Sequence, residues 1–221
     1  MEVQHPTESH RGLLSKSVAK PIQELAILIL AGGDSERLGC RKAFYKVNGK
    51  IMIKHVFDRT TNLSREVVIS CKLGREELKA MFPTARVTVD KSGEKGPLIG
   101  MMDALPEISA DYVAVLACDC PMVKPEVVEF MFRCAEGHDG ALLRWPNGYM
   151  EPLQAVYRTK LLLGAAESAR KNGRNKLGDV VDSLDDVVYL TPDELKRVDS
   201  ELESFMNINS RDDLSKHRWK F

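Results

Sequence analysis

The sequence has no excess of either charge. It contains 32 lysine and arginine residues and 32 aspartate and glutamate residues, so its formal net charge at pH 7 is zero. A neutral chain does not attract nucleic acid or an anionic membrane through its overall field, and its basic residues are therefore expected to act locally. No apolar run approaches the roughly 20 residues of a membrane span. We predict a protein that binds neither nucleic acid nor a membrane.

Cysteine is scarce and present in odd number. The five cysteines are scattered along the chain and do not form the even set of a disulfide framework. We expect them to be thiols in the reducing cytoplasm, most of them buried. Cys118 and Cys120 flank Asp119, but they lack a CxxC partner and a nearby histidine. The sequence therefore does not predict a zinc site at this position.

The length of 221 residues is typical of one α/β domain with a substantial core. Residues 1–24 are a polar mixture without the apolar centre of a secretory signal, and we expect them to form a flexible extension. Residues 25–221 are expected to form the folded domain.

Strand-like and helix-like segments alternate through the first part of the chain. Strands are predicted at 25–31, 66–71, 86–89 and 111–118, and helices at 53–63, 74–82, 97–105 and 125–135. This alternation is typical of an α/β protein with a mostly parallel sheet.

The pattern changes after residue 140. Two predicted strands, 141–145 and 153–157, surround an Asn147-Gly148 turn, which indicates a small antiparallel portion. Helices at 160–171, 176–183 and 212–216 and short strands at 186–190 and 204–208 complete the prediction.

The first predicted strand leads into a loop suited to phosphate. Gly32 and Gly33 follow it directly, and Arg37 and Lys42 come shortly after. Backbone N–H groups freed by glycine bind anions, and basic side chains add positive charge. The loop is neither GxGxxG nor GxxxxGK[ST], so an ordinary basic surface loop is the alternative.

Three loops are predicted to meet at the carboxyl edge of the sheet, namely 32–42, 90–100 and 119–121. Asp119 comes directly after the strand at 111–118, where a carboxylate beside phosphates suits Mg²⁺. The alternative is that Asp119 forms the turn before Pro121.

Several motifs of this sequence resemble those of one protein family and occur in the same order along the chain. Leu30-Ala31-Gly32-Gly33, Arg37-Leu38-Gly39 and Lys42 resemble the LAGG-x(3)-R-M-G-x(2)-K signature of nucleotidyltransferases, in particular the molybdenum cofactor guanylyltransferases. Further matches to that family are Asp90 with 96–100 (D-x(n)-GPLAG), 118–121 (C-D-x-P), 151–158 (HPLxAVYR), 205–209 (F-x-N-[IV]-N) and 210–214 (T-P-E-[DE]-L).

The resemblance implies a Rossmann-like, three-layer nucleotidyltransferase fold and a Mg²⁺-dependent enzyme that transfers GMP from GTP to molybdenum-bound molybdopterin. It implies catalytic roles for Arg37, Lys42 and Asp119, with Asp119 as the metal ligand. The implied nucleotide and cofactor contacts are Leu30, Ala31, Gly32, Gly33, Lys42, Ser70, Asp90, Gly96, Asp119, Asn207 and Asn209. Its implied partners are molybdoenzymes or proteins that insert the cofactor.

The sequence departs from the family pattern at three positions. Arg41 stands where the family has Asp, Glu151 replaces its His, and Ser70 stands where some members have Asn. Two alternatives therefore stay open. One is a CTP- or GTP-dependent nucleotidyltransferase acting on another phosphorylated precursor, and the other is a non-catalytic GTP-binding carrier of the cofactor.

Overall fold

The computed structural model describes residues 20–32, 34–35, 40–90, 96–210 and 212–213. Most of the predicted extension at 1–24 lies outside these residues, as do residues 214–216 of the predicted closing helix. Ile22 is buried, and its N–H donates to the carbonyl of Leu63 at 2.8 Å. The packed domain therefore includes Ile22.

A seven-stranded sheet forms the centre of the molecule, in the order β11-β9-β10-β8-β1-β6-β7. The strands are β1 (Leu25–Leu30), β6 (Glu66–Cys71), β7 (Arg86–Val89), β8 (Tyr112–Ala117), β9 (Gly140–Arg144), β10 (Met150–Arg158) and β11 (Val187–Leu190). Neighbouring strands are parallel except at β10, which is antiparallel to both β8 and β9. The predicted α/β class, with a small antiparallel portion, is confirmed.

The two central strands consist of apolar residues without polar alternation. Every residue of β1, with sequence LAILIL, is buried, and β8, with sequence YVAVLA, is buried up to its last residue. A strand that is covered on both faces needs apolar side chains on both faces. These two strands therefore lie in the middle of the sheet, and their ends mark the middle of its carboxyl edge.

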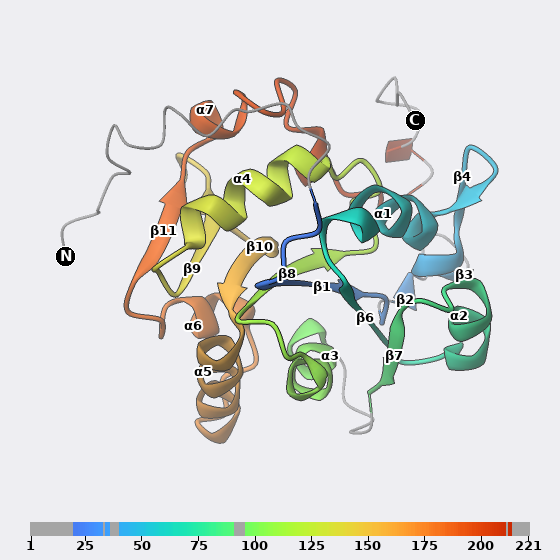
Figure 1. Ribbon diagram of the computed structural model, residues 1–221, viewed down its shortest axis with the longest axis horizontal. Coiled ribbons are helices and arrows are strands. Elements are labelled where there is room, and N and C mark those ends of the chain that lie inside the picture. Colours follow the sequence, from blue (N-terminus) through green and yellow to red (C-terminus); the bar gives the residue numbers. More distant parts are fainter. Residues whose placement is uncertain (1–19, 33, 36–39, 91–95, 211, 214–221) are drawn as a thin grey trace.

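Helices cover both faces of the sheet and give three layers (Figure 1). They are α1 (Met52–Thr60), α2 (Arg75–Met81), α3 (Pro97–Ala104), α4 (Pro125–Ala135), α5 (Thr159–Lys171), α6 (Leu177–Val181) and α7 (Pro192–Leu195). Figure 1 shows α1 and α4 on one face and α3, α5 and α6 on the other, with α2 beside β7 at the end of the sheet. The predicted three-layer architecture is confirmed.

Short hairpins occupy the chain between β1 and α1. Strands β4 (Lys46–Val47) and β5 (Lys50–Ile51) pair around Asn48 and Gly49, whose φ angles are +49° and +77°. Two positive φ values in a two-residue loop are typical of the hairpin turn that the Asn-Gly dipeptide predicts. Strands β2 (Asp34–Ser35) and β3 (Cys40–Arg41) form a second two-residue ladder.

The prediction of a strand at 204–208 is wrong. A 3₁₀ turn covers Glu203–Phe205, and the chain then continues without a ladder. The N–H of Ile208 donates to the carbonyl of Asp119 at 2.8 Å, which is a single bond to a loop and not a strand pairing. Local apolar alternation resembles a strand, but this segment joins none of the described sheets and bonds instead to the loop after β8.

Helix α7 was not predicted, although its start carries a recognisable signal. The hydroxyl of Thr191 accepts from the N–H of Glu194, and the Glu194 carboxylate accepts from the N–H of Thr191. This reciprocal pair is a capping box, which satisfies two helix-end donors.

Gly140 on β9 lies close to the backbone of β10. A Cβ atom at this position would lie 2.7 Å from Cδ1 of Tyr157 and 2.8 Å from the carbonyl oxygen of Val156. We predict that Gly140→Ala lowers the free energy of unfolding by about 1–3 kcal/mol, because the added methyl group overpacks a buried strand pair. Urea denaturation measures the change.

Gly164→Ala is the matched control. Gly164 lies on an exposed part of α5, and a Cβ atom there would meet nothing within 4 Å. This variant should be as stable as the parent or up to about 1 kcal/mol more stable, because alanine favours the helix. Unchanged stability of Gly140→Ala would contradict the tight spacing of β9 and β10.

Candidate active site

The candidate active site lies at the carboxyl ends of β1 and β8, which are neighbouring parallel strands. The N–H of Cys118 donates to the carbonyl of Leu30 at 3.1 Å, and the N–H of Ala31 donates to the carbonyl of Ser70 at 2.7 Å. The chain therefore leaves three neighbouring strands at one edge. Ligands of open α/β sheets bind in this position.

Lys42 joins three segments that are far apart in the sequence. Its Nζ forms an ion pair with Oδ2 of Asp119 and donates to Oδ1 of Asn209 at 2.5 Å. The side chains of Lys42 and Asp119 are only 13% and 17% exposed. Partial burial reduces screening by water, so both charges act more strongly on a ligand placed between them. The predicted meeting of the loops that carry Lys42 and Asp119 is therefore present in the structure, and the contact of Lys42 with Asn209 is an addition that the sequence analysis did not predict.

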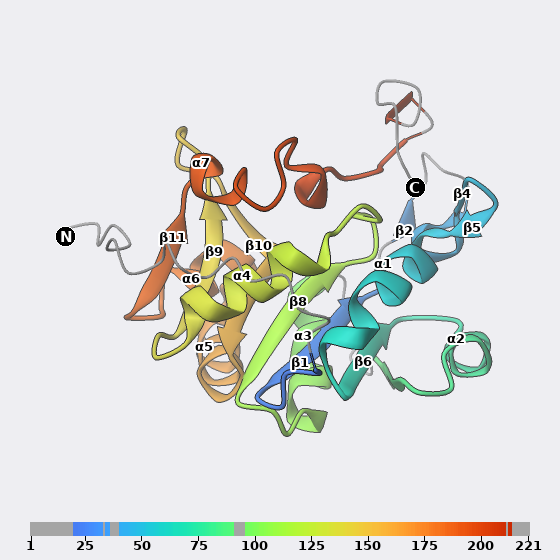
Figure 2. The same cartoon turned by 45° about the horizontal axis from the view of Figure 1, so that its top comes forward.

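The C-terminal segment reaches this site by crossing over the edge of the sheet. Figure 2 shows it running from α7 toward the side of α1 and β4. Ile208 is buried, whereas Asn207 and Asn209 on either side of it are exposed. The thiol of Cys120 donates to Oδ1 of Asn207 at 2.8 Å. Both asparagines therefore lie at the loop that follows β8.

A partly buried ionic cluster, here called the C-terminal clamp, fixes the approach of this segment. Lys124 Nζ lies 2.6 Å from Oδ1 of Asp199 and 3.0 Å from Oε2 of Glu203, and the side chain of Asp199 is fully buried. Ser204 donates its N–H to Asp199 at 2.8 Å, and its hydroxyl accepts from the N–H of Lys124 at 3.0 Å. Gln154 also donates to the Ser204 carbonyl at 2.8 Å. The sequence offered no signal for this pairing.

The glycines of the predicted motifs have different environments. At Gly32 a Cβ atom would come no closer than 3.9 Å to a neighbour, the backbone nitrogen of Lys72, so packing does not require glycine there. At Gly100 a Cβ atom would lie 2.8 Å from the hydroxyl of Ser70. Gly100 therefore allows α3 to pack closely on β6, and Gly32 leaves space beside β1 for a ligand.

The remaining predicted site residues are distributed around the same edge. Ser70 is 2% exposed, with its hydroxyl toward Gly100. Asp90 follows β7, and its N–H donates to the carbonyl of Cys71 at 3.0 Å. Gly96, with φ of +130°, precedes α3. Gly33 and Arg37 lie outside the described residues.

The donor set at Asp119 fits a metal that arrives with phosphate. Within the described ranges no group of three or more His, Cys, Asp or Glu side chains could hold a metal ion. Burial, together with the neighbouring Asp119 charge, raises the pKa of Cys118 to about 12, so this thiol is a poor zinc ligand. Mg²⁺ commonly uses one or two carboxylates and completes its shell with phosphate oxygens and water. Asp119 fits that role.

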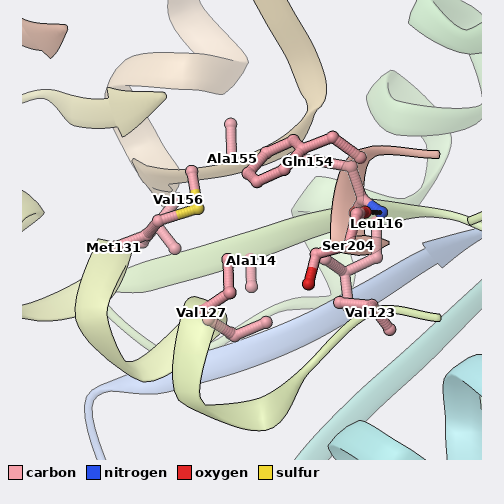
Figure 3. Close-up of a pocket in the computed structure, with 11 residues that line it drawn as sticks. Ala114, Leu116, Val123, Val127, Met131, Gln154, Ala155, Val156 and Ser204 are labelled. Atoms are coloured by element: carbon pink, nitrogen blue, oxygen red, sulfur yellow. Dashed lines mark hydrogen bonds between the residues drawn. The ribbon is translucent and has the colours of Figure 1, made fainter. Parts of the chain in front are cut away.

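A small hollow between α4 and the sheet is not the ligand site. Figure 3 shows Val127 and Met131 of α4 facing Ala114 and Val156 of the sheet. Lys42 and Asp119 do not line this hollow, and most of its lining is aliphatic. It belongs to the hydrophobic core beneath α4.

A lysine and an aspartate that meet at the carboxyl edge of a mostly parallel sheet suit a protein that binds phosphate together with a divalent metal. The chain belongs to the MobA-like NTP transferase family, whose domain model matches residues 27–187. This confirms the family that the sequence motifs indicated. Nucleotidyltransferases of this kind generally use a divalent metal ion.

Curated relatives and solved structures agree with this assignment. A probable molybdenum cofactor guanylyltransferase from Methanosarcina mazei is 33% identical over 196 residues, covering 85% of this chain and 87% of the relative. One from Pyrococcus horikoshii is 35% identical over 195 residues, covering 86% and 97%. The crystal structure of molybdopterin-guanine dinucleotide biosynthesis protein A from Archaeoglobus fulgidus is 30% identical, covers 86% and 95%, and superposes with a TM-score of 0.74.

More distant structures share the fold alone. The 2-C-methyl-D-erythritol 4-phosphate cytidylyltransferase of Thermus thermophilus is 19% identical, covers 88% of this chain and 97% of its own, and has a TM-score of 0.64. Across the part of the chain that the structure describes, no helix is long and apolar enough to span a membrane.

The C-terminal clamp makes a pH-dependent contribution to stability. Burial alone would raise the pKa of Asp199, but hydrogen bonds from Lys124 and Ser204 outweigh it and lower the pKa. A lowered pKa stabilises the fold above the unfolded value of about 3.9, and this contribution is lost as the pH falls below it. We predict that Asp199→Asn is less stable than the parent near neutral pH, and that the difference shrinks below about pH 4. Urea denaturation across this range measures it.

Asp193→Asn is the control for the clamp. Asp193 lies on α7 with a 92% exposed side chain, 3.3 Å from Lys196. Ion pairs between exposed side chains contribute little to the free energy of unfolding. Asp193→Asn should therefore change this free energy by less than about 1 kcal/mol at any of these pH values. A pH-independent loss in Asp199→Asn would show that its charge does not stabilise the clamp.

Proposed function

We propose that this protein transfers GMP from GTP to molybdenum-bound molybdopterin and releases pyrophosphate. The observation that carries the proposal is the contact of Lys42 with Asp119 and Asn209 at the carboxyl edge of the sheet. The relatives named molybdenum cofactor guanylyltransferase support the choice of nucleotide and acceptor.

The reaction needs positioning and charge more than covalent chemistry. The terminal phosphate of the acceptor attacks the α-phosphorus of GTP, the bond to the β-phosphate oxygen breaks, and pyrophosphate leaves. Phosphoryl-type transfer depends mainly on alignment of the reacting groups and on neutralising the charge that develops. No enzyme-bound intermediate is required.

The residues of the site divide these tasks. In the proposal, the backbone at Gly32 and Gly33 holds the phosphates, and Lys42 and Arg37 neutralise charge on the α-phosphate and the departing pyrophosphate. Asp119 would hold Mg²⁺, which supplies positive charge to the triphosphate when bound. Asn209, which accepts from Lys42, sets the position of the lysine amine.

The surroundings of the reaction follow from the same proposal. We place the protein in the cytoplasm, where molybdoenzymes or cofactor-insertion proteins receive the product. Free, buried thiols at Cys71, Cys118, Cys120 and Cys134 support a reducing compartment.

Nucleotide choice is the first test. We predict that GTP with Mg²⁺ raises the melting temperature and that CTP, ATP and UTP do not. A ligand at 100 times its Kd stabilises by about 2.7 kcal/mol, which corresponds to a rise of roughly 5–10 °C for a domain of this size. Thermal-shift measurements with each nucleotide, with Mg²⁺ or with a chelator, provide the test. A larger shift with CTP would favour cytidylyl transfer instead.

Asp119→Asn is the control for the metal in this experiment. Asparagine keeps the size of the side chain but removes the charge that Mg²⁺ requires. The variant should fold and should lose the part of the GTP shift that depends on Mg²⁺. A full Mg²⁺-dependent shift would leave Asp119 with only its role in the turn before Pro121.

Lys42 tests whether the site acts on the transition state. Negative charge grows on pyrophosphate as it leaves, so Lys42 should interact more strongly with the transition state than with bound GTP. We predict that Lys42→Ala lowers kcat by roughly 10²–10³ and raises the KM for GTP much less. Steady-state kinetics with varied GTP and saturating molybdopterin measure both constants.

Lys46→Ala is the matched control, because Lys46 is an exposed lysine on β4. Its substitution should leave both constants unchanged, and Arg41→Ala should also have a small effect. Equal effects of Lys42→Ala and Lys46→Ala would contradict a catalytic role for Lys42. GTP binding without any transfer by the unaltered protein would favour the cofactor carrier.

A further inference from the structure

The turn between β9 and β10 presents two aromatic residues and a carboxylate. The N–H of Trp145 donates to the carbonyl of Tyr149 at 2.7 Å, and the N–H of Gly148 donates to the carbonyl of Trp145 at 2.8 Å. The side chain of Asn147 accepts from the N–H of Tyr149 at 3.0 Å. These bonds give the turn a defined shape, and Tyr149 is nevertheless 61% exposed at its tip.

Glu151 is a partly buried carboxylate with unused hydrogen-bonding capacity. Its Oε1 accepts from Nε1 of Trp145 at 2.9 Å. Among the described residues, no second hydrogen bond and no ion pair involves Glu151. Burial raises the pKa of Glu151 and the nearby charge of Asp119 adds to the rise, although the Trp145 bond lowers it. An ionised carboxylate in such a place costs free energy unless a ligand satisfies it.

The sheet places Glu151 across Asp119 from the phosphate loop. Strand β10 pairs antiparallel with β8, with Gln154 opposite Leu116, so the start of β10 lies beside the carboxyl end of β8. Strand β1, which leads to Gly32, lies on the other side of β8. Asp119 therefore separates the proposed triphosphate side of the site from the side that carries Glu151.

We propose that Glu151, Trp145 and Tyr149 form the subsite for the flat heterocycle of the acceptor. This inference rests on the proposed function. A carboxylate accepts two parallel hydrogen bonds from adjacent N–H donors, and pterin rings carry such a pair in the 2-amino group and the neighbouring ring N–H. The exposed ring of Tyr149 offers a face on which a heterocycle stacks. Trp145 holds Glu151 in position by donating to its first oxygen.

Guanine has the same donor edge as pterin, so the same chemistry admits two sources. The sheet order favours the acceptor, because the nucleotide phosphates are assigned to the β1 side of Asp119. The test must separate acceptor, guanine and metal as occupants.

Equilibrium binding of a fluorescent pterin tests the subsite without requiring GMP transfer. The probes are 6-hydroxymethylpterin monophosphate and its lumazine analogue, in which oxygen replaces the 2-amino group. The unaltered protein should bind the pterin roughly 10–100-fold more tightly than the lumazine, as expected for a paired donor edge. Glu151→Gln should lose most of this preference, because the amide replaces one acceptor with a donor.

Two further variants separate the aromatic contribution from general damage. Tyr149→Ala should weaken both probes equally, and Tyr149→Phe should restore binding, because stacking needs the ring and not the hydroxyl. Tyr149 is exposed, so neither change threatens folding. The control is Glu136→Gln, which removes the charge of a carboxylate 3.4 Å from Arg133 on the surface and should change nothing.

Each alternative gives its own result. A pterin preference that survives in Glu151→Gln overturns the proposal. A changed preference for GTP over ITP, which lacks the 2-amino group, would assign Glu151 to guanine, and a changed Mg²⁺ requirement would assign it to the metal. Failure of GMP transfer by the unaltered protein would refute the proposed function, whereas the pterin titration would still report on the subsite.

Discussion

The ion pair of Lys42 with Asp119 is the interaction on which the site depends. Each group neutralises the other in a partly buried position, and Asn209 adds a third contact to the lysine amine. Opposite charges held at low exposure interact more strongly than charges on an open surface. In the proposed function, a triphosphate with its metal would bring negative charge toward Lys42 and positive charge toward Asp119. The ion pair would therefore hold both side chains where the proposed ligand needs them.

The C-terminal clamp, which is partly buried, links the two segments that carry Asp119 and Asn209. Lys124 follows the loop that carries Asp119, and it binds Asp199, which precedes the segment that carries Asn209. Buried ion pairs are weak evidence for stability by themselves, since desolvation offsets much of their attraction. Their geometric demands are strict, however, because each charge must be matched by a partner. In this protein they link the loop after β8 to the C-terminal segment, which forms a 3₁₀ turn at Glu203–Phe205 and joins no sheet within the described residues.

The site has two sides, one next to β1 and one next to β10, with Asp119 between them. The fold is shared with a cytidylyltransferase that is 19% identical, so architecture alone does not select the nucleotide or the acceptor. The β1 side carries Gly32 and Lys42, which the proposed function assigns to the triphosphate. The β10 side carries Glu151 and Trp145, which donates a hydrogen bond to the Glu151 carboxylate. If Glu151 binds the acceptor as proposed, a substitution there would change acceptor selectivity and leave the contacts of Lys42 unchanged.

The sequence by itself determined the layered architecture and the meeting of Lys42 with Asp119. Strands Glu66–Cys71 and Arg86–Val89 and helix Pro125–Ala135 were predicted with their observed bounds, because apolar periodicity and turn residues are local properties. Because the carboxyl ends of parallel strands lie at one edge of the sheet, the loops that follow them bring together polar residues that are far apart in the sequence, such as Lys42 and Asp119. Only the tertiary structure decided that the chain near Ile208 bonds to a loop and not to a sheet, and that Lys124 pairs with Asp199. Those contacts join segments more than 70 residues apart, and their partners depend on which buried groups remain unsatisfied once the sheet has formed.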